Sequence, residues 1–225
     1  MIDNPQAVMT NFLSIIISLT VHEYAHAFVA NYMGDPTPAR HNRLNLNPLT
    51  IIKAHPFGAL IIPLIGSVNG FLLGWAATPV NPRLVDRKYT LRQAERWIAI
   101  AGPLSNIILA LVFALTFSIL MYLSASQTVD GEAIKPIIHL SETLVFTNIF
   151  LAIFNMIPIP PFDGFVVLYN TLPREMSNIA VYINQYGNMI LLFVFFFGGR
   201  ILSPIIYEIA QLFFRLSYQF IGLFV

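Results

Sequence analysis

The chain has 225 residues, of which 56% are hydrophobic, only 10% are charged and none is cysteine. A soluble domain carries about 25% charged residues, so this composition indicates an integral membrane protein, and the length suits one membrane-embedded domain over residues 1–225. The net charge of +1 gives no reason to expect a nucleic-acid partner, and the lack of cysteine excludes disulfides and thiolate metal ligands.

The first apolar segment, roughly residues 7–33, predicts a retained membrane helix. No basic residue precedes it, no small-residue cleavage site follows it, and it ends at a Gly-Asp-Pro helix stop. Its polar residues recur at spacings of three and four, so they form one stripe that must face protein or water rather than lipid. These residues are Asn11, Ser14, Ser18, His22 and His26.

The same helix contains the sequence His22-Glu23-Tyr24-Ala25-His26. Two histidines four residues apart lie on one helix face and can bind a single metal ion, and the glutamate can sit beside the position where the metal holds a water. Such a motif also arises by chance. However, each polar residue costs on the order of a few kcal/mol inside a membrane, so those kept there are usually functional.

The next two stretches indicate loops on the cytoplasmic side. Residues 34–56 and 76–96 together hold eight of the twelve Lys and Arg residues, which the positive-inside rule places in the cytoplasm. The apolar residues 57–75 between them therefore predict a re-entrant hairpin, with a plain sixth crossing as the alternative. Within the first loop, residues 43–47 alternate with a period of two, which predicts a short strand.

Four more crossings are expected, which makes about five full transmembrane helices with the N-terminus outside and the C-terminus inside. They lie at about residues 97–123, 137–157, 180–198 and 201–224. Three prolines between Pro158 and Pro161 predict irregular backbone before Asp163. The fold class is thus an all-α polytopic membrane protein with one small strand or hairpin in a cytoplasmic loop.

Depth along these helices brings distant polar residues together. At a rise of about 1.5 Å per residue, His22, His26, Asn106 and Asp163 all lie roughly 12–18 Å below the same cytoplasmic face. Asp163 is therefore placed to be the third metal ligand. The alternative is that Asp163 only caps the helix that follows it.

Three segments together resemble the site-2 protease family of zinc intramembrane metalloproteases. They are His-Glu-Tyr-Ala-His at 22–26, Ala-Gly-Pro-Leu-Ser-Asn at 101–106, and residues 155–164, which resemble the family's Asn-x-x-Pro-x-x-Pro-Leu-Asp-Gly. The match covers a catalytic core of about residues 7–172, ahead of the C-terminal helices at about 180–224. Residues 34–50 also resemble the short bacterial and archaeal members, although His55 stands where an aspartate is expected. No PDZ insertion and no nucleotide-binding regulatory tail is apparent.

The resemblance implies a zinc endopeptidase that cuts transmembrane segments of membrane proteins. It is expected in a prokaryotic inner membrane, with its active site open toward the cytoplasm. One Zn²⁺ per chain would be held by His22, His26 and Asp163, with Glu23 as general base. Asn106 and Asn155 are expected either to contact the substrate or oxyanion, or only to bond neighbouring helices.

The predicted strand offers an edge at Leu44, Asn45 and Leu46, to which an extended substrate could add. Two other classes stay open. One is a membrane zinc transporter that uses the same ligands, and the other is an inactive adaptor that binds transmembrane segments.

Overall fold

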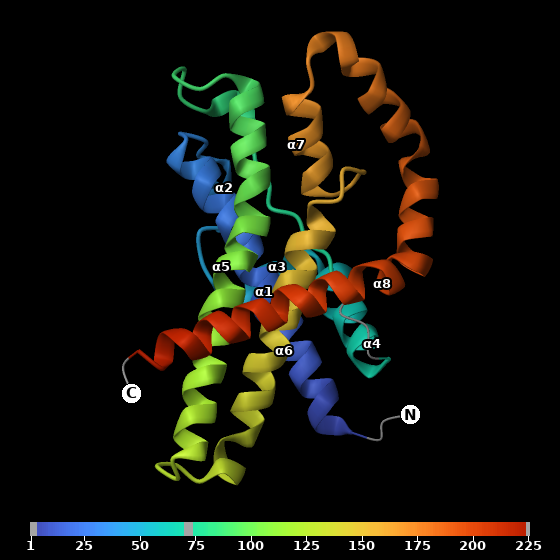
Figure 1. Ribbon diagram of the computed structural model, residues 1–225. Helices are drawn as coiled ribbons and strands as arrows, with labels where there is room; N and C mark the ends of the chain where they lie inside the picture. The colour runs from blue at the N-terminus through green and yellow to red at the C-terminus, as the bar shows by residue number, and fades with distance from the viewer. Residues whose placement is uncertain (1–3, 70–73, 224–225) are drawn as a thin grey trace.

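The computed structural model describes residues 4–69 and 74–223, which form helices joined by loops and turns (Figure 1). No strand occurs in these described ranges. The elements in chain order are α1 (Pro5–Tyr32), α2 (Thr37–Arg40), α3 (Pro48–Ala54), the π-helix η1 (Phe57–Ile61), α4 (Ile62–Val68), the 3₁₀ helix η2 (Pro82–Leu84), α5 (Leu91–Ala125), α6 (Gly131–Asn155), α7 (Asp163–Thr171), the 3₁₀ helix η3 (Arg174–Met176) and α8 (Ser177–Ile221).

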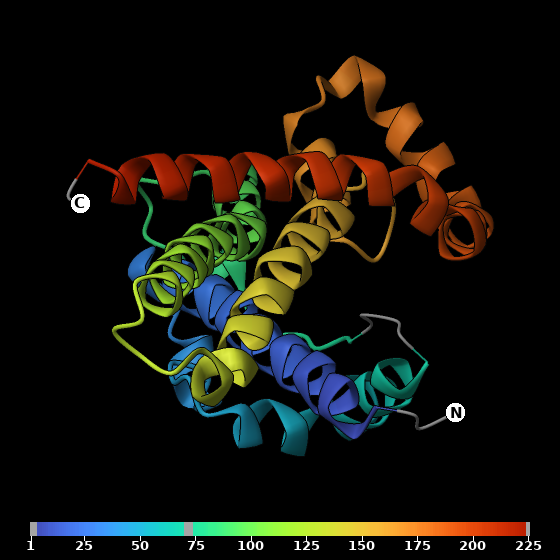
Figure 2. The same ribbon diagram turned by 60° about the horizontal axis from the view of Figure 1, so that its bottom comes forward.

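Within the described residues, the helices α1, α5 and α6 are long and apolar enough to cross a membrane. Each begins at a polar cap: the side chains of Asn4, Thr90 and Asp130 accept hydrogen bonds from the first-turn N–H groups. The three helices pack on one another, with α6 lying along α5 and α1 crossing both (Figures 1 and 2). The protein is therefore an integral membrane protein with apolar helical spans.

Residues 57–75 leave the bundle and come back to the same place. η1 and α4 carry the chain outward, and after the return the Trp75 N–H donates to the Gly58 carbonyl at 2.8 Å. A side chain at Gly58 would collide with the Trp75 carbonyl oxygen, so only glycine permits this close approach. The two ends of this segment therefore lie side by side, as the predicted hairpin requires, while residues 70–73, where the chain would turn, lie outside the described residues.

The returning chain is fastened along α1. Asp35, which has no exposed surface, accepts the Asn81 N–H on one carboxylate oxygen (2.6 Å) and the Thr37 N–H on the other (2.9 Å). Thr78 donates its hydroxyl to the backbone carbonyl of Glu23 at 3.0 Å. These bonds hold an extended segment, residues 75–80, across the middle of α1.

The predicted strand at residues 43–47 is wrong. The Asn45 side chain donates to the Asn42 carbonyl (2.6 Å) and accepts from the Asn47 N–H (2.9 Å), while Asn47 caps α3. Asparagine side chains compete in this way for the backbone groups that a sheet would need, so the segment folds into turns. Leu44, Asn45 and Leu46 therefore present no strand edge to a substrate.

The two predicted C-terminal crossings are one continuous helix. α8 runs through Gly198-Gly199-Arg200, where a break was expected, and it carries Pro204 in its interior. The helix bends, and its second half lies across α5 and α6 (Figure 2). There Ile206, Ala210 and Phe214 pack against small and branched side chains of α5 and α6 to form the largest buried apolar cluster. This burial stabilises the helix beyond the glycine pair.

Candidate metal centre

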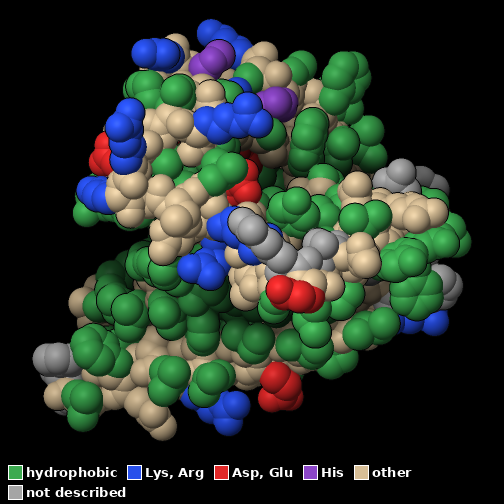
Figure 3. Space-filling view, turned by 90° about the horizontal axis from the view of Figure 1, so that it is seen from above, with side chains coloured by type: hydrophobic (Ala, Val, Ile, Leu, Met, Phe, Trp, Pro, Cys, Tyr) green, Lys and Arg blue, Asp and Glu red, His purple; other side chains and the backbone are tan. Residues whose placement is uncertain are grey.

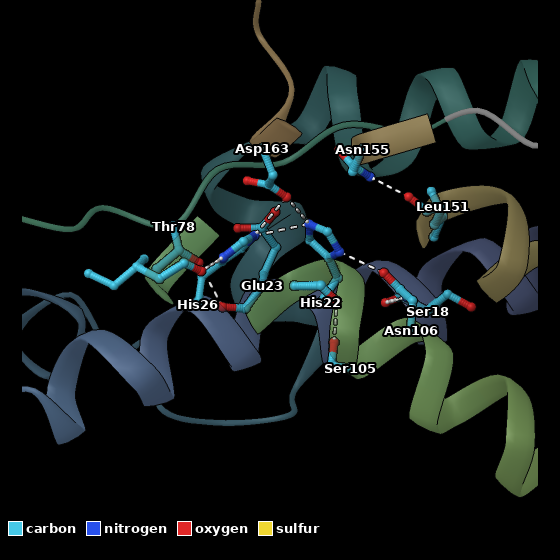
Figure 4. A network of polar contacts seen from close by, with 12 residues as sticks. Ser18, His22, Glu23, His26, Thr78, Ser105, Asn106, Leu151, Asn155 and Asp163 are labelled. Carbon is cyan, nitrogen blue, oxygen red and sulfur yellow. Dashed lines mark hydrogen bonds and ion pairs between the residues drawn. The ribbon is translucent and has the colours of Figure 1, made fainter. Parts of the chain in front are cut away.

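Two histidines of α1 lie next to each other, with ring nitrogens turned toward one another (Figure 4). The Nε2 atoms of His22 and His26 lie 3.0 Å apart, and the residues are 4% and 9% exposed. The i, i+4 spacing within an uninterrupted helix places both rings on one face, as the sequence predicts.

Asp163 meets this pair from the other end of the chain. The residues between α6 and α7 form irregular turns, and a side chain at Gly164 would collide with the Met156 carbonyl oxygen, so the turn closes tightly onto α6. Asp163 Oδ2 comes to lie 3.3 Å from His22 Nε2 and 3.4 Å from His26 Nε2. The cap position of α7 is Phe162, and no side chain forms a capping bond there, so helix capping does not explain Asp163.

The outer ring nitrogens fix the tautomers of both histidines. His22 Nδ1 lies 2.6 Å from Asn106 Oδ1, and His26 Nδ1 lies 2.6 Å from the Ile98 carbonyl oxygen. Both partners are acceptors, so each Nδ1 carries the proton and each Nε2 presents a lone pair to the centre.

A chain of amides determines which way Asn106 points. Asn148 donates Nδ2 to the Leu144 carbonyl and to Ser18 Oγ, both at 2.8 Å, so its Oδ1 faces the other way. That oxygen accepts Asn106 Nδ2 at 2.8 Å, and a second acceptor, the Ser18 carbonyl, lies 3.4 Å from the same nitrogen. Asn106 Oδ1 is thereby turned toward His22, and the orientation rests ultimately on a backbone carbonyl.

The donor set fits a cation such as zinc. The Nε2 lone pairs of the two imidazoles and a carboxylate oxygen of Asp163 converge on one point. None of these three atoms carries a proton, and Asp163 Oδ2 is buried with no hydrogen-bond partner. Two imidazoles with one carboxylate are a ligand set that zinc accepts while keeping a fourth position open. Among the described residues, His22, His26 and Asp163 form the group of His, Asp and Glu side chains that could hold a metal ion.

α5 leaves space for this centre only because residue 102 is glycine. A Cβ at Gly102 would lie 2.6 Å from His22 Nε2 and would also collide with His26 Nε2. The helix therefore passes directly beside the two imidazoles.

Glu23 lies beside the three ligands (Figure 4). The residue is 5% exposed, and its Oε2 is buried without a hydrogen-bond partner. A carboxylate held this way is free to interact with a molecule that enters the site.

The metal centre adjoins a cavity of about 790 Å³ between the extended segment, α6, α7 and the first half of α8. His22, Glu23, His26 and Asp163 line it together with mainly apolar side chains, among them Trp75, Phe150, Phe154, Phe162 and Leu192.

The other predicted site residues lie in different surroundings. Asn106 has no exposed surface and both ends of its amide are engaged, which favours helix-to-helix positioning over substrate contact. Asn155 lines the cavity, half-buried, and donates to the Leu151 carbonyl at 2.9 Å. His55, which stands where an aspartate was expected, is not part of the metal-ligand group. Its Nε2 lies 2.8 Å from the Ala77 carbonyl oxygen.

Sequence reasoning missed Asn148, Gly102 and Thr78. Asn148 carried one usable signal, because an amide in the interior of an apolar span is costly unless it has a partner. Gly102 falls within the motif at residues 101–106, but no role was assigned to it, and Thr78 carried no signal, since both roles depend on which helices lie beside them.

Comparison with known proteins agrees with this geometry. Residues 10–196 match the model of peptidase family M50. The chain is 31% identical over 197 residues to the "putative zinc metalloprotease YwhC" of Bacillus subtilis, covering 86% of this chain and 84% of that protein. Rip2 of Mycolicibacterium smegmatis, described in the same words, is 27% identical over 177 residues, 78% of this chain and 62% of its own length.

MJ0611 of Methanocaldococcus jannaschii is 37% identical over 107 residues, which are 46% of this chain and 50% of that protein. No solved structure matches. The chain thus spans most of YwhC but less than two thirds of Rip2 and MJ0611.

A metal-ligand triad inside a bundle of apolar helices defines the class as a membrane-embedded metalloprotease. The chain belongs to peptidase family M50, the site-2 protease family, and is a zinc metalloprotease of that family.

Proposed function

We propose that this protein is a zinc-dependent intramembrane endopeptidase that hydrolyses peptide bonds within transmembrane segments of membrane-protein substrates. The observation that carries the proposal is the position of the ligand triad. It lies between apolar spans and opens into a large apolar cavity, which Glu23 also lines.

His22, His26 and Asp163 would hold one Zn²⁺ per chain. When bound, zinc supplies a Lewis acid that polarises the scissile carbonyl and makes a water acidic enough to lose its proton near neutral pH. Glu23 accepts that proton and returns it to the leaving amine nitrogen, for which its unpartnered Oε2 is suited. Asn106 and Ile98 keep the two imidazoles in the tautomers that present Nε2.

The substrate enters as an extended peptide, because a helix conceals its peptide bonds in its own hydrogen bonds. Residues 75–80 belong to no helix and most of them line the cavity, so we propose that this segment, rather than residues 43–47, pairs with the extended substrate. Asn155 also lines the cavity. One hydrogen of its side-chain NH₂ group is bonded to the Leu151 carbonyl, and the other can bond the substrate backbone or the oxyanion.

The site is proposed to open toward the cytoplasm of a prokaryotic cell, with the N-terminus outside. The clustering of Lys and Arg in residues 34–56 and 76–96 supports this orientation.

Purified wild type and Glu23→Gln, reconstituted with single-span substrates, test the function. We expect cleavage by wild type only, with a loss of at least about 10²-fold in the variant, because glutamine cannot accept the proton. Glu142→Gln on α6, the same change at a partly exposed glutamate outside the cavity lining, is a matched control that should retain cleavage.

A transporter or an adaptor would behave differently. Zinc flux into liposomes or substrate capture that survives Glu23→Gln, with no cleavage by either protein, would reject the protease assignment.

A further inference from the structure

A second, polar pocket lies on the loop between α1 and η1, away from the metal centre. Its volume is about 540 Å³. His41, Arg43 and Lys53 line it together with the polar side chains of Asn47 and Thr50, and none of its lining residues is acidic. Figure 3 shows His, Lys and Arg side chains close together at one edge of this face of the molecule.

Arg43 is buried in this pocket without a counter-charge. The residue is 8% exposed, and its Nη1 has neither solvent contact nor a hydrogen-bond partner. The described residues supply its guanidinium with no hydrogen bond or ion pair; only its backbone N–H is bonded, to the Pro38 carbonyl at 2.8 Å. Arginine is almost never this buried unless it is paired, because desolvating an unpaired charge is costly. An anion in the pocket would give this guanidinium a partner that the described residues do not supply.

The surroundings indicate an amphipathic ligand. Leu49 lines the pocket and is 56% exposed, and the nearby Leu46 and Phe57 are 57% and 76% exposed. The loop follows the first apolar span directly, so the pocket lies where headgroups meet the hydrocarbon. Exposed apolar side chains at this level suit acyl chains, while guanidinium and ammonium groups are the donors that phosphate prefers.

We propose that this pocket binds the phosphate group of an anionic phospholipid. Arg43 contributes the buried guanidinium, Lys53 an ammonium at the rim, and Leu46 and Leu49 the apolar contact with the chains. A free phosphate ion shares the headgroup chemistry but makes no use of the exposed leucines, so the lipid is the favoured source. The site does not depend on the proteolytic activity.

Titration of the full-length protein in detergent with phosphatidylglycerol or phosphatidylcholine, followed by native mass spectrometry, tests the proposal. We expect wild type to retain phosphatidylglycerol in preference to phosphatidylcholine. Arg43→Gln and Lys53→Gln should each weaken that binding about tenfold or more, the usual effect of losing a hydrogen bond to a charged group. Arg40→Gln removes an exposed charge of the same loop that does not line the pocket, so it should bind as wild type does.

Zinc content of the same samples reports that each variant is folded. Lys53 is exposed, so Lys53→Gln remains informative if Arg43→Gln does not fold. Equal retention of phosphatidylglycerol by wild type and Lys53→Gln would overturn the proposal, as would equal retention of the two lipids by wild type. Displacement of the lipid by millimolar inorganic phosphate would show a site for free phosphate and would overturn the assignment to a lipid.

Discussion

Asn148 orients His22 without being one of the three metal-ligand residues. Asn148 is anchored to the Leu144 carbonyl, and through Asn106 it fixes the proton on the outer nitrogen of His22. Groups bonded directly to a metal ligand, as Asn106 is, typically change metal affinity 10–100-fold when they are removed, and Asn148 acts one hydrogen bond further out.

Asn148→Ala should therefore weaken zinc binding by about 10-fold, because Asn106 can then rotate and offer its NH₂ group to His22. Competition with a chelator of known affinity measures this. Asn155→Ala is the matched control, since Asn155 makes the same bond to the residue four before it on the same helix but none toward a histidine. Similar zinc affinity for both variants would contradict the positioning role.

At this scale the sequence predicted the three ligands because spacing and depth constrain them directly. The role of Asn106 was left open between substrate contact and helix bonding, since one sequence does not reveal which side chains surround an amide. The structure supplies those neighbours, and the hydrogen bonds of Asn106 favour the second role.

At the scale of elements, α5 illustrates how a helix makes room for a metal. Gly102 of α5 lies directly against α1, and any side chain there would collide with both imidazoles. Gly199 on α8 is also helical, but a Cβ there would meet nothing within 4 Å.

Gly102→Ala is expected to abolish zinc binding, because the added methyl occupies the space of the imidazole nitrogens. Gly199→Ala should keep its zinc and gain about 0.5–1 kcal/mol of helix stability, since alanine is the better helix former. Zinc content and thermal unfolding of the two purified variants measure these effects. A zinc-loaded Gly102→Ala protein would show that α5 lies further from the centre than described.

The two errors of sequence interpretation also belong to elements. Period-two alternation at residues 43–47 is shared by strands and by asparagine-rich turns, and here the amides bond their own backbone. The glycine pair in α8 was expected to end a helix, but packing of Ile206 and Phe214 on α5 and α6 stabilises its continuation. Local patterns did not contain either of these tertiary contacts.

For the whole molecule, the proposed orientation in the membrane can be tested on one span, α5, which has a basic loop at one end only. The loop before α5 holds Arg87 and Lys88, whereas the loop after it, near Ser126, has no Lys or Arg. The absence of native cysteine makes single-cysteine labelling clean.

In intact cells, Ser126→Cys should react with a membrane-impermeant maleimide, while Arg87→Cys should react only after the membrane is permeabilised. The expectation follows from the positive-inside rule applied to the two ends of α5. Labelling of both positions from the same side would contradict α5 as a span.

The measurement that tests the central claim most directly is the zinc content of the purified protein compared with that of Asp163→Ala. Asp163 lies 137 positions after His26 in the sequence, so its contribution depends on the fold as a whole. We predict about one zinc per wild-type chain and a large loss in the variant, because three protein ligands are the usual minimum for such a site. A wild type without zinc, or an Asp163→Ala protein that keeps its full content, would contradict the metal centre on which the proposed function rests.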